Sequence, residues 1–261
     1  MLVKIKVCYL ESDLYMIEFF KVSIASVNIE IECRYRTVFN QCKDYLNDFE
    51  NTDLIISTNQ EEIEREVSRL PSVNNPYNGV ATSRSLGYIE STIIQRKLAN
   101  AMLFFNSFLL HGSVIAKDGY AYVFTAPSGI GKTTRTRLWL DTYPGSVVVN
   151  GDKPIIKISD TEVYACGTPW CGKEGWNTNT MVPLRAVFLL ERAEKSSIEE
   201  VNLGKALPFL LQQIHCPEDP DQMRKTLQLL KALEGKVRIY KFRSTPTEES
   251  VRLAYETAKP Q

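Results

Sequence analysis

The sequence has little of what several classes of protein require. It contains two histidines among 261 residues, and none of its six cysteines forms a Cys-x-x-Cys pair. A zinc site built from cysteine and histidine is therefore not expected. The N-terminal stretch Met1–Lys6 interleaves charged and apolar residues instead of forming the apolar core of a signal peptide. We expect free thiols in a reducing cytoplasm.

An excess of either charge and a long hydrophobic run are also missing. Lys+Arg and Asp+Glu each number 31, so the formal net charge is zero and nothing favours nucleic acid or an anionic membrane as a partner. The most apolar run, Ala101–Ala116, is interrupted by Asn106, Ser107 and His111 and is too short to span a bilayer. These absences predict a soluble, cytoplasmic protein.

What the sequence does contain is a glycine-rich stretch, Ala126–Thr134, between two segments of opposite character. The alternating apolar run Gly119–Thr125 before it predicts a strand, and 132–141 after it predicts a helix that Pro144-Gly145 ends. Strand, glycine-rich turn and helix are the context of a phosphate-binding loop. Ala126 stands where the pattern Gly-x4-Gly-Lys-[Ser/Thr] has its first glycine, and we treat it as a variant of the pattern.

The predicted loop binds phosphate through its backbone N–H groups and the positive end of the helix dipole. Lys132 would bring a positive charge to the β- and γ-phosphates, and the Thr133 hydroxyl would bind Mg²⁺. The expected ligands are ATP and Mg²⁺; the alternative is a glycine-containing turn that binds nothing. The expected nucleotide-binding residues are Pro127, Ser128, Gly129, Ile130, Gly131, Lys132, Thr133 and Thr134.

A hairpin upstream of the loop predicts a position for His111. The strand-like runs 108–116 and 120–125 are joined by Lys117-Asp118-Gly119, a favourable hairpin turn. Antiparallel pairing about this turn sets His111 opposite Thr125 or Ala126. We therefore expect His111 at the mouth of the phosphate loop.

Asp152 follows the short β-branched run 146–150. An acidic residue at the end of such a strand, soon after a phosphate loop, suits a carboxylate that binds Mg²⁺ or water. The alternative is that Asp152 only forms the turn.

The stretch 167–179 is long and irregular, with three glycines and two tryptophans. Such loops are commonly functional, and this one could cover the phosphates as a lid. Lys173 would then neutralise the transferring charge, and Glu174 would complete the metal site. The alternative is an Ω-loop held by its tryptophans.

The chain as a whole divides into an N-terminal β-rich accessory region, 1–86, and a kinase domain, 87–261. Residues 71–79 are the best candidate for a linker because they are rich in Pro, Asn and Gly. Further strands are expected over 2–9, 14–20, 29–38, 54–57, 155–158, 162–166, 186–190 and 237–242, and helices over 61–70, 88–105, 203–215, 220–233 and 246–258.

Taken together, these motifs resemble a known family. Ala126–Thr133, with His111-Gly112 upstream and Gly151-Asp152 downstream, resembles the catalytic domain of HPr kinase/phosphorylase and the P-loop of phosphoenolpyruvate carboxykinase. HPr-kinase-like proteins of bacterial gene clusters are more similar still, through Asp152-Lys-Pro and the run 167–174. The resemblance extends from Tyr88 to the C-terminus.

The resemblance implies an α/β fold, a mixed sheet with flanking helices, and transfer of the γ-phosphoryl group of ATP to a hydroxyl. Some family members phosphorylate a serine of a small peptide or a metabolite, and HPr kinases form oligomers, so a homo-oligomer is possible. The family has two adjacent aspartates after the strand, whereas Gly151 leaves Asp152 alone here. Either Asp152 accepts the proton of the acceptor hydroxyl with help from His111, or Asp152 holds Mg²⁺ and His111 or Glu174 takes a larger part in the chemistry. Phosphorylase activity is not carried over.

The leading hypothesis is a kinase that acts on a hydroxyl of a peptide, protein or small molecule. Its predicted catalytic residues are Asp152, His111, Lys132 and Lys173, and its predicted metal ligands are Thr133, Asp152 and Glu174. A second hypothesis is a nucleotide-binding protein that recognises a precursor peptide or partner enzyme without transfer. Carboxykinase chemistry is less favoured because the chain is short and lacks a cluster of metal-binding histidines. The sequence lacks the Asn-Lys-x-Asp motif by which GTPases recognise guanine, and it lacks the Leu-Ser-Gly-Gly-Gln motif of transporter ATPases. Neither class is therefore favoured.

Overall fold

A computed structural model describes residues 17–69 and 83–260. The chain divides into two compact units, Met1–Ala101 and Met102–Gln261. The boundary expected between residues 86 and 87 lies inside helix α3 (Ser83–Met102), nearly all of which belongs to the first unit. The strand expected over 2–9 and the linker expected over 71–79 lie outside the described residues.

The first unit contains a three-stranded sheet in the order β1-β2-β3. Its first two strands pair antiparallel, and β3 pairs parallel to β2. The region was expected to be β-rich, but its described part contains more helix than strand. Its elements are β1 (Glu18–Ile24), β2 (Val27–Cys33), α1 (Arg36–Gln41), η1 (Lys43–Tyr45), β3 (Leu54–Ser57), α2 (Gln60–Arg69) and α3.

The strand expected over 29–38 ends early, and the reason is a contact distant in sequence. The buried carboxylate of Glu90, on α3, accepts hydrogen bonds from the backbone N–H groups of Arg34 at 2.7 Å and Tyr35 at 2.9 Å. These two N–H groups bond to Glu90 instead of to a neighbouring strand, just before α1 begins, so β2 ends at Cys33. A local pattern of apolar residues does not reveal such a contact.

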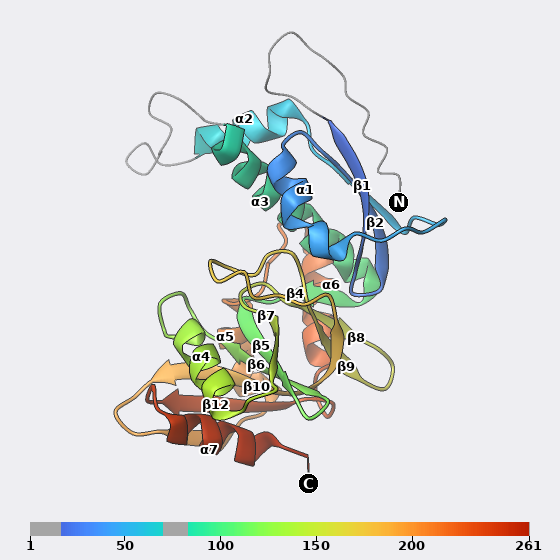
Figure 1. Ribbon diagram of the computed structural model, residues 1–261. Helices are drawn as coiled ribbons and strands as arrows, with labels where there is room; N and C mark the ends of the chain where they lie inside the picture. Colours follow the sequence, from blue (N-terminus) through green and yellow to red (C-terminus); the bar gives the residue numbers. More distant parts are fainter. Residues whose placement is uncertain (1–16, 70–82, 261) are drawn as a thin grey trace. The chain divides into compact units, whose positions relative to one another are not determined.

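The second unit is a mixed α/β structure around one large curled sheet (Figure 1). Its sheet order is β4-β8-β9-β10-β6-β5-β7, with β12 on β10 and β11 on β12. The elements are η2 (Leu103–Phe105), β4 (Ser107–Leu109), β5 (Gly112–Lys117), β6 (Tyr120–Thr125), α4 (Lys132–Thr142), β7 (Val147–Asn150), β8 (Ile155–Ile158), β9 (Val163–Cys166), β10 (Met181–Arg192), β11 (Ser197–Glu200), α5 (Leu203–Leu211), α6 (Pro220–Lys231), β12 (Arg238–Ser244) and α7 (Glu248–Ala258).

The long strand β10 connects two parts of this sheet. Its first residues pair antiparallel with β9, whereas residues from Ala186 onward pair parallel with β6 on one side and β12 on the other. A register shift between Leu184 and Ala186 separates the two halves. The parallel strands β6, β10 and β12 therefore end at one edge of the sheet, which is where ligands bind in open α/β sheets.

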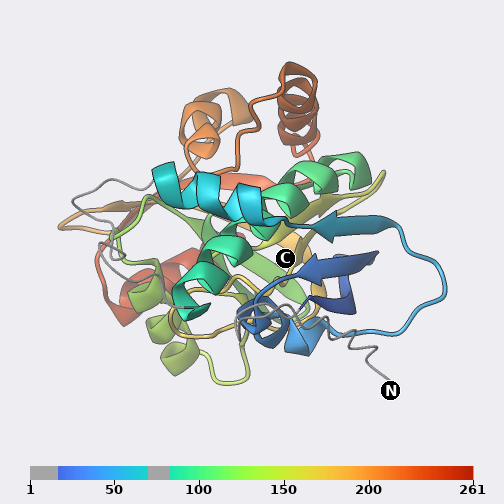
Figure 2. The ribbon, with the colours of Figure 1, turned by 90° about the horizontal axis from the view of Figure 1, so that it is seen from above.

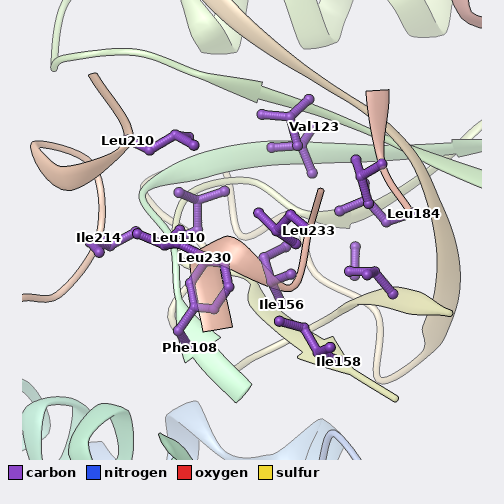
Figure 3. Packing of buried hydrophobic residues seen from close by; sticks show 14 of the residues in the cluster. Phe108, Leu110, Val123, Ile156, Ile158, Leu184, Leu210, Ile214, Leu230 and Leu233 are labelled. Carbon is purple, nitrogen blue, oxygen red and sulfur yellow. The ribbon is translucent and has the colours of Figure 1, made fainter. Parts of the chain in front are cut away.

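Helices cover both faces of the sheet, and β6 shows why its sequence is apolar throughout. Ala121 and Val123 pack into a core with α5 and α6, part of which Figure 3 shows. Tyr122 and Phe124 pack on the other face, against residues of α4 and α7. Figure 2 shows α5 and α6 (orange) on the opposite side of the sheet from α4 (light green). A strand buried on both faces needs apolar residues at every position.

The single strand expected over 108–116 is divided into two strands: β4 pairs with β8, whereas β5 pairs with β6 and β7. Several other elements differ from expectation at their ends. The helix expected over 203–215 ends at Leu211, and the helix expected over 246–258 begins at Glu248. Strand β11 was not expected. Among the described residues no helix combines the length and the apolar character needed to cross a bilayer. The described cysteines are free thiols, namely Cys33, Cys42, Cys166, Cys171 and Cys216.

Candidate functional site

The hairpin of β5 and β6 places His111 beside the start of the glycine-rich turn, as its sequence predicts. Gly112 pairs with Thr125, so His111 precedes the strand just where β6 ends. Asp118 (φ 50°) and Gly119 (φ 81°) form the two-residue turn, both in the left-handed region that such a hairpin needs. The Thr125 hydroxyl donates to the His111 carbonyl at 2.8 Å, which fixes the two chain segments together.

The predicted strand, turn and helix around the glycine-rich stretch are all present. Strand β6 ends at Thr125, residues 126–131 form the turn, and α4 begins at Lys132. Gly129 (φ +83°) and Gly131 (φ +113°) adopt backbone conformations that L side chains rarely adopt. The turn therefore requires glycine at both positions, and it exposes the first N–H groups of α4 at its end.

Lys132 is held against the beginning of the turn. Its ammonium group donates to the carbonyl of Ala126 at 2.8 Å and to that of Pro127 at 3.4 Å. Burial lowers the pKa of Lys132, the charge of Lys153 lowers it further, and the negative charge of Asp152 acts against both. Lys132 and Asp152 thus belong to one electrostatic site, although twenty residues separate them in the chain.

Asn150, which the sequence analysis did not single out, shapes the turn that carries Asp152. Its side-chain oxygen accepts from the backbone N–H groups of Asp152 at 2.8 Å and Lys153 at 2.7 Å. Its amide nitrogen donates to the Thr168 carbonyl at 2.9 Å, which ties the turn to the next loop. Asparagine commonly bonds the backbone two residues on in turns, and this preference at Asn150-Gly151-Asp152 is a signal that could have identified it.

Asp152 and His111 form a side-chain pair. His111 Nε2 lies 3.3 Å from Asp152 Oδ1, and His111 Nδ1 lies 3.2 Å from Gln213 Oε1. Gln213 also accepts the backbone N–H of His111 at 2.6 Å. The imidazole ring is therefore held on both sides, and one of its neighbours is a residue for which the sequence contained no signal.

The charge state of Asp152 follows from its surroundings. Burial by itself raises the pKa of the Asp152 carboxyl, but the hydrogen bond with His111 and the charges of Lys153 and Lys132 outweigh it, so the pKa lies below the ordinary 3.8. Asp152 is ionised at neutral pH. The site thus joins one carboxylate to two lysines and an imidazole.

Gly151, the residue before Asp152, has no room for a side chain. A Cβ built on Gly151 would lie 2.6 Å from the carbonyl oxygen of Cys171, far inside van der Waals contact. The N–H of Gly151 donates to the Trp176 carbonyl at 2.8 Å. The loop after β9 therefore occupies the space that an aspartate side chain would need.

The loop 167–180 is fastened at its base and again near its tip. At the base, Lys153 donates its N–H to the Trp170 carbonyl at 3.1 Å. Near the tip, the Glu174 carboxylate lies 3.5 Å from the Arg137 guanidinium of α4, and Arg137 also lies over the ring of Trp176 at 5.7 Å. Lys173 is exposed next to Glu174. The lid and Ω-loop interpretations both remain predictions, as do the roles of Lys173 and Glu174.

A cavity of about 380 Å³ opens on the other side of the glycine-rich turn from Asp152. It lies at the edge where β10 and β12 end, and its lining includes Ile130 and Thr134 of the turn and helix, Arg192 of β10 and Ser244 of β12. This volume lies within the range of small-molecule sites.

The buried guanidinium of Arg135 lines the same cavity. It donates to Ser250 Oγ at 3.0 Å, to the Thr245 carbonyl at 3.0 Å and to Ser244 Oγ. Burial lowers the pKa of Arg135 to about 10, so its positive charge persists at neutral pH. No carboxylate of the described residues forms an ion pair with it. Arg135 therefore ties α4 to the turn after β12 and brings a positive charge to a cavity whose lining also includes Glu191 and Arg192.

The structure brings some predicted residues together and leaves others apart. Asp152, His111 and Lys132 form one site, and Thr133 and Thr134 lie in the first turn of α4 beside it. Glu174 lies 3.5 Å from Arg137 of α4, and its role as a metal ligand stays a prediction. No group of three or more His, Cys, Asp or Glu side chains within residues 17–69 and 83–260 could hold a metal ion.

Comparison with known proteins gives little beyond this geometry. No family model matches the sequence, and no curated protein matches it. Among solved structures, the Hpr(Ser) kinase/phosphatase from Coxiella burnetii is similar over 57% of this chain and 86% of that chain, at 11% sequence identity and a TM-score of 0.35. A likeness this weak supports no conclusion about function, and the function proposed below depends on the site itself.

Proposed function

We propose that this protein is a kinase that binds ATP with Mg²⁺ and transfers the γ-phosphoryl group to a hydroxyl of a peptide, protein or small molecule. The observation that carries the proposal is the His111–Asp152 pair beside a strand–turn–helix that presents Lys132 and free helix N–H groups. Phosphoryl transfer needs chiefly positioning and charge neutralisation, together with a group that accepts the hydroxyl proton.

The proposed step uses the two oxygens of Asp152 differently. Oδ1 faces His111, which orients the carboxylate, so Oδ2 is left to accept the proton of the acceptor hydroxyl. The acceptor oxygen forms a bond to the γ-phosphorus while the bond from that phosphorus to the bridging β–γ oxygen breaks, and ADP leaves with the electron pair. Lys132 and the loop N–H groups stabilise the charge on the phosphates. Lys173, at the exposed tip of its loop, closes on the transferring group.

A magnesium ion fits this arrangement only together with its nucleotide. Mg²⁺ is usually held by one or two carboxylates plus substrate phosphates, in contrast to an all-protein cage. The described residues contain no cage of three ligands, and Thr133 with Asp152 is a donor set of this smaller kind. The ion would neutralise phosphate charge.

The nucleotide has one favourable orientation in this site. Its γ-phosphate has to lie near Asp152 and Lys132, on the side of β6 where β5 and β7 run. The nucleoside then extends to the other side, toward the cavity lined by Ile130, Thr134 and Arg192. The positive charge of the buried Arg135 favours the α-phosphate of the nucleotide on that side.

The test is transfer of labelled γ-phosphate from Mg-ATP into a soluble cell extract split into polypeptide and small-molecule fractions. Asp152→Asn keeps the shape of the side chain but removes the proton acceptor, so we expect transfer to fall by at least about 100-fold. Lys132→Ala removes the buried ammonium and should abolish transfer. Label in one fraction then identifies the class of acceptor.

Two matched variants control for unspecific effects. Asp160→Asn changes an exposed aspartate in the β8–β9 turn, and Lys231→Ala removes an exposed lysine of α6. Both should transfer at the wild-type rate. Full transfer by Lys132→Ala or Asp152→Asn would sink the kinase proposal.

A second candidate function is a nucleotide-dependent recognition protein that performs no transfer. The closed space at Gly151 favours it, because a second aspartate cannot be accommodated and a single carboxylate has to serve both proton and metal. Such a protein would bind Mg-ATP with saturation and leave it intact. Saturable binding without any labelled product in either fraction is the result that would favour this function.

A further inference from the structure

We infer that Arg192 is a positioning residue for the phosphate loop: it holds two carbonyl groups so that the following N–H groups face the nucleotide phosphates. This inference rests on the proposed function, because it concerns the same loop. The observations behind it are the hydrogen bonds that Arg192, at the end of β10, makes to the glycine-rich turn. The sequence did not predict these bonds.

The position of Arg192 follows from the sheet. Leu189 of β10 pairs with Thr125 of β6, so the residues after Leu189 run alongside the turn that follows Thr125. Leu190 packs on the face that α4 covers, and Arg192, two residues on, points to the same side. Its guanidinium donates from Nη2 to the Gly129 carbonyl at 2.6 Å and from Nε to the Ile130 carbonyl at 3.2 Å.

These two bonds determine where the next amide groups point. In a trans peptide the C=O and the following N–H point in opposite directions. With the carbonyls of Gly129 and Ile130 turned to Arg192, the N–H groups of Ile130 and Gly131 point away from it. Two successive N–H groups on one side form a concavity that binds anions. The same bonds keep two carbonyl dipoles away from the phosphates, which they would repel.

Ala126 is buried in the core and Ile130 packs against it, but the glycines of the loop have no such packing. Apart from the glycine itself and residues near it in the chain, no described atom lies within 4 Å of the position where a Cβ of Gly129 or Gly131 would lie, so packing does not restrain these glycines. Glycine has more conformations to lose than any other residue. Side-chain hydrogen bonds to the carbonyl groups of the loop come from Lys132 at its start and from Arg192 at its middle. A planar guanidinium suits a pair of neighbouring carbonyls better than an ammonium group does.

The experiment compares Arg192→Ala with Arg243→Ala. Arg243 is a matched control because it is also exposed, lies at the end of the neighbouring strand, and pairs with Glu191 instead of the loop. Backbone order parameters of Ile130 and Gly131 are measured by NMR without nucleotide. Affinities for Mg-ATP and for inorganic tripolyphosphate are measured by calorimetry.

A positioning role predicts two effects of Arg192→Ala that Arg243→Ala does not share. The order parameters of both amides fall from the rigid value of about 0.85 toward 0.6 or less. Both ligands bind about tenfold more weakly, because both use the two N–H groups.

Three results would overturn the inference. Unchanged order parameters with weaker binding would mean that Arg192 contacts phosphate directly. Weaker binding of Mg-ATP alone would mean that it contacts the nucleoside, since it also lines the cavity. Order parameters that fall while both affinities stay unchanged would mean that the loop does not need the restraint. If the wild-type protein binds neither ligand, the proposed function fails and the inference fails with it.

Discussion

The charge of Asp152 and the lack of space for a side chain at Gly151 are each set by residues from other parts of the chain. Asp152 is ionised because His111, Lys153 and Lys132 surround it, and these residues come from a hairpin, a turn and a helix. Gly151 is required because the carbonyl of Cys171 lies against it. The chemistry of Asp152 and the absence of an aspartate beside it thus have separate causes.

Gly151→Ala should damage both stability and transfer. The added Cβ meets a backbone oxygen, which cannot move aside as a flexible side chain can, and overpacking of this kind typically costs about 1–3 kcal/mol. Relief of the clash displaces either the Asp152 turn or the loop 167–180. We expect a lower midpoint in urea unfolding and slower phosphoryl transfer.

Gly204→Ala is the control for that change. A Cβ at Gly204, in the first turn of α5, would meet only the side-chain oxygen of Asn202, at 3.5 Å. Alanine is the better helix former, so this variant should be as stable as wild type or slightly more stable. A Gly151→Ala variant with wild-type stability and transfer would show that the loop carries no constraint at this position.

Among the elements, α4 contacts the loop 167–180 through the side chain of Glu174. Its carboxylate pairs with Arg137, and the pair is partly exposed, so its contribution to stability is expected to be about 0.2–1 kcal/mol. Because α4 begins at the end of the glycine-rich turn, the pair links the loop 167–180 to the helix that carries Lys132.

We expect Glu174→Gln and Arg137→Gln to slow transfer to a similar extent, and the double variant to be no slower than either. This is the result of a double-mutant cycle in which two residues act through one contact. The Mg²⁺ concentration that gives half-maximal rate should be the same in all four proteins. An increase in that concentration confined to the variants without Glu174 would instead favour the role of metal ligand.

The whole molecule consists of two units, and the proposed site belongs to the second. A ligand that binds only the folded state stabilises the unit that binds it, by about 2.7 kcal/mol at a concentration 100 times its Kd. Mg-ATP should therefore raise the stability of residues 102–260 and leave that of residues 17–69 unchanged.

Hydrogen exchange in increasing urea, followed by mass spectrometry of peptides, measures both units in one sample. Peptides from β6, β10 and β12 should show the shift with Mg-ATP, and peptides from β1 and β2 should not. The control variant Asp160→Asn should show the same shift. Equal shifts in both units would mean that the chain unfolds as a single cooperative body.

The sequence by itself determined the local features of this protein. The alternating and fully apolar runs predicted β5, β6, β7 and the hairpin of β8 with β9. Such runs are informative because a strand buried on one face alternates apolar and polar residues, and a strand buried on both faces is apolar throughout. The strand, glycine-rich turn and helix at 120–142 followed from side-chain type and backbone preference alone. The hairpin register placed His111 because its turn sets the pairing within a few residues.

The tertiary structure decided what depends on residues distant in the chain. Glu90 ends β2 from a helix more than fifty residues away, Gln213 holds His111 from the segment after α5, and Arg192 reaches the glycine-rich turn from β10. Cys171 excludes a side chain at Gly151. No short window of sequence contains both partners of such a contact. The sequence could therefore identify individual residues of the site, whereas tertiary packing determined which of these residues contact one another.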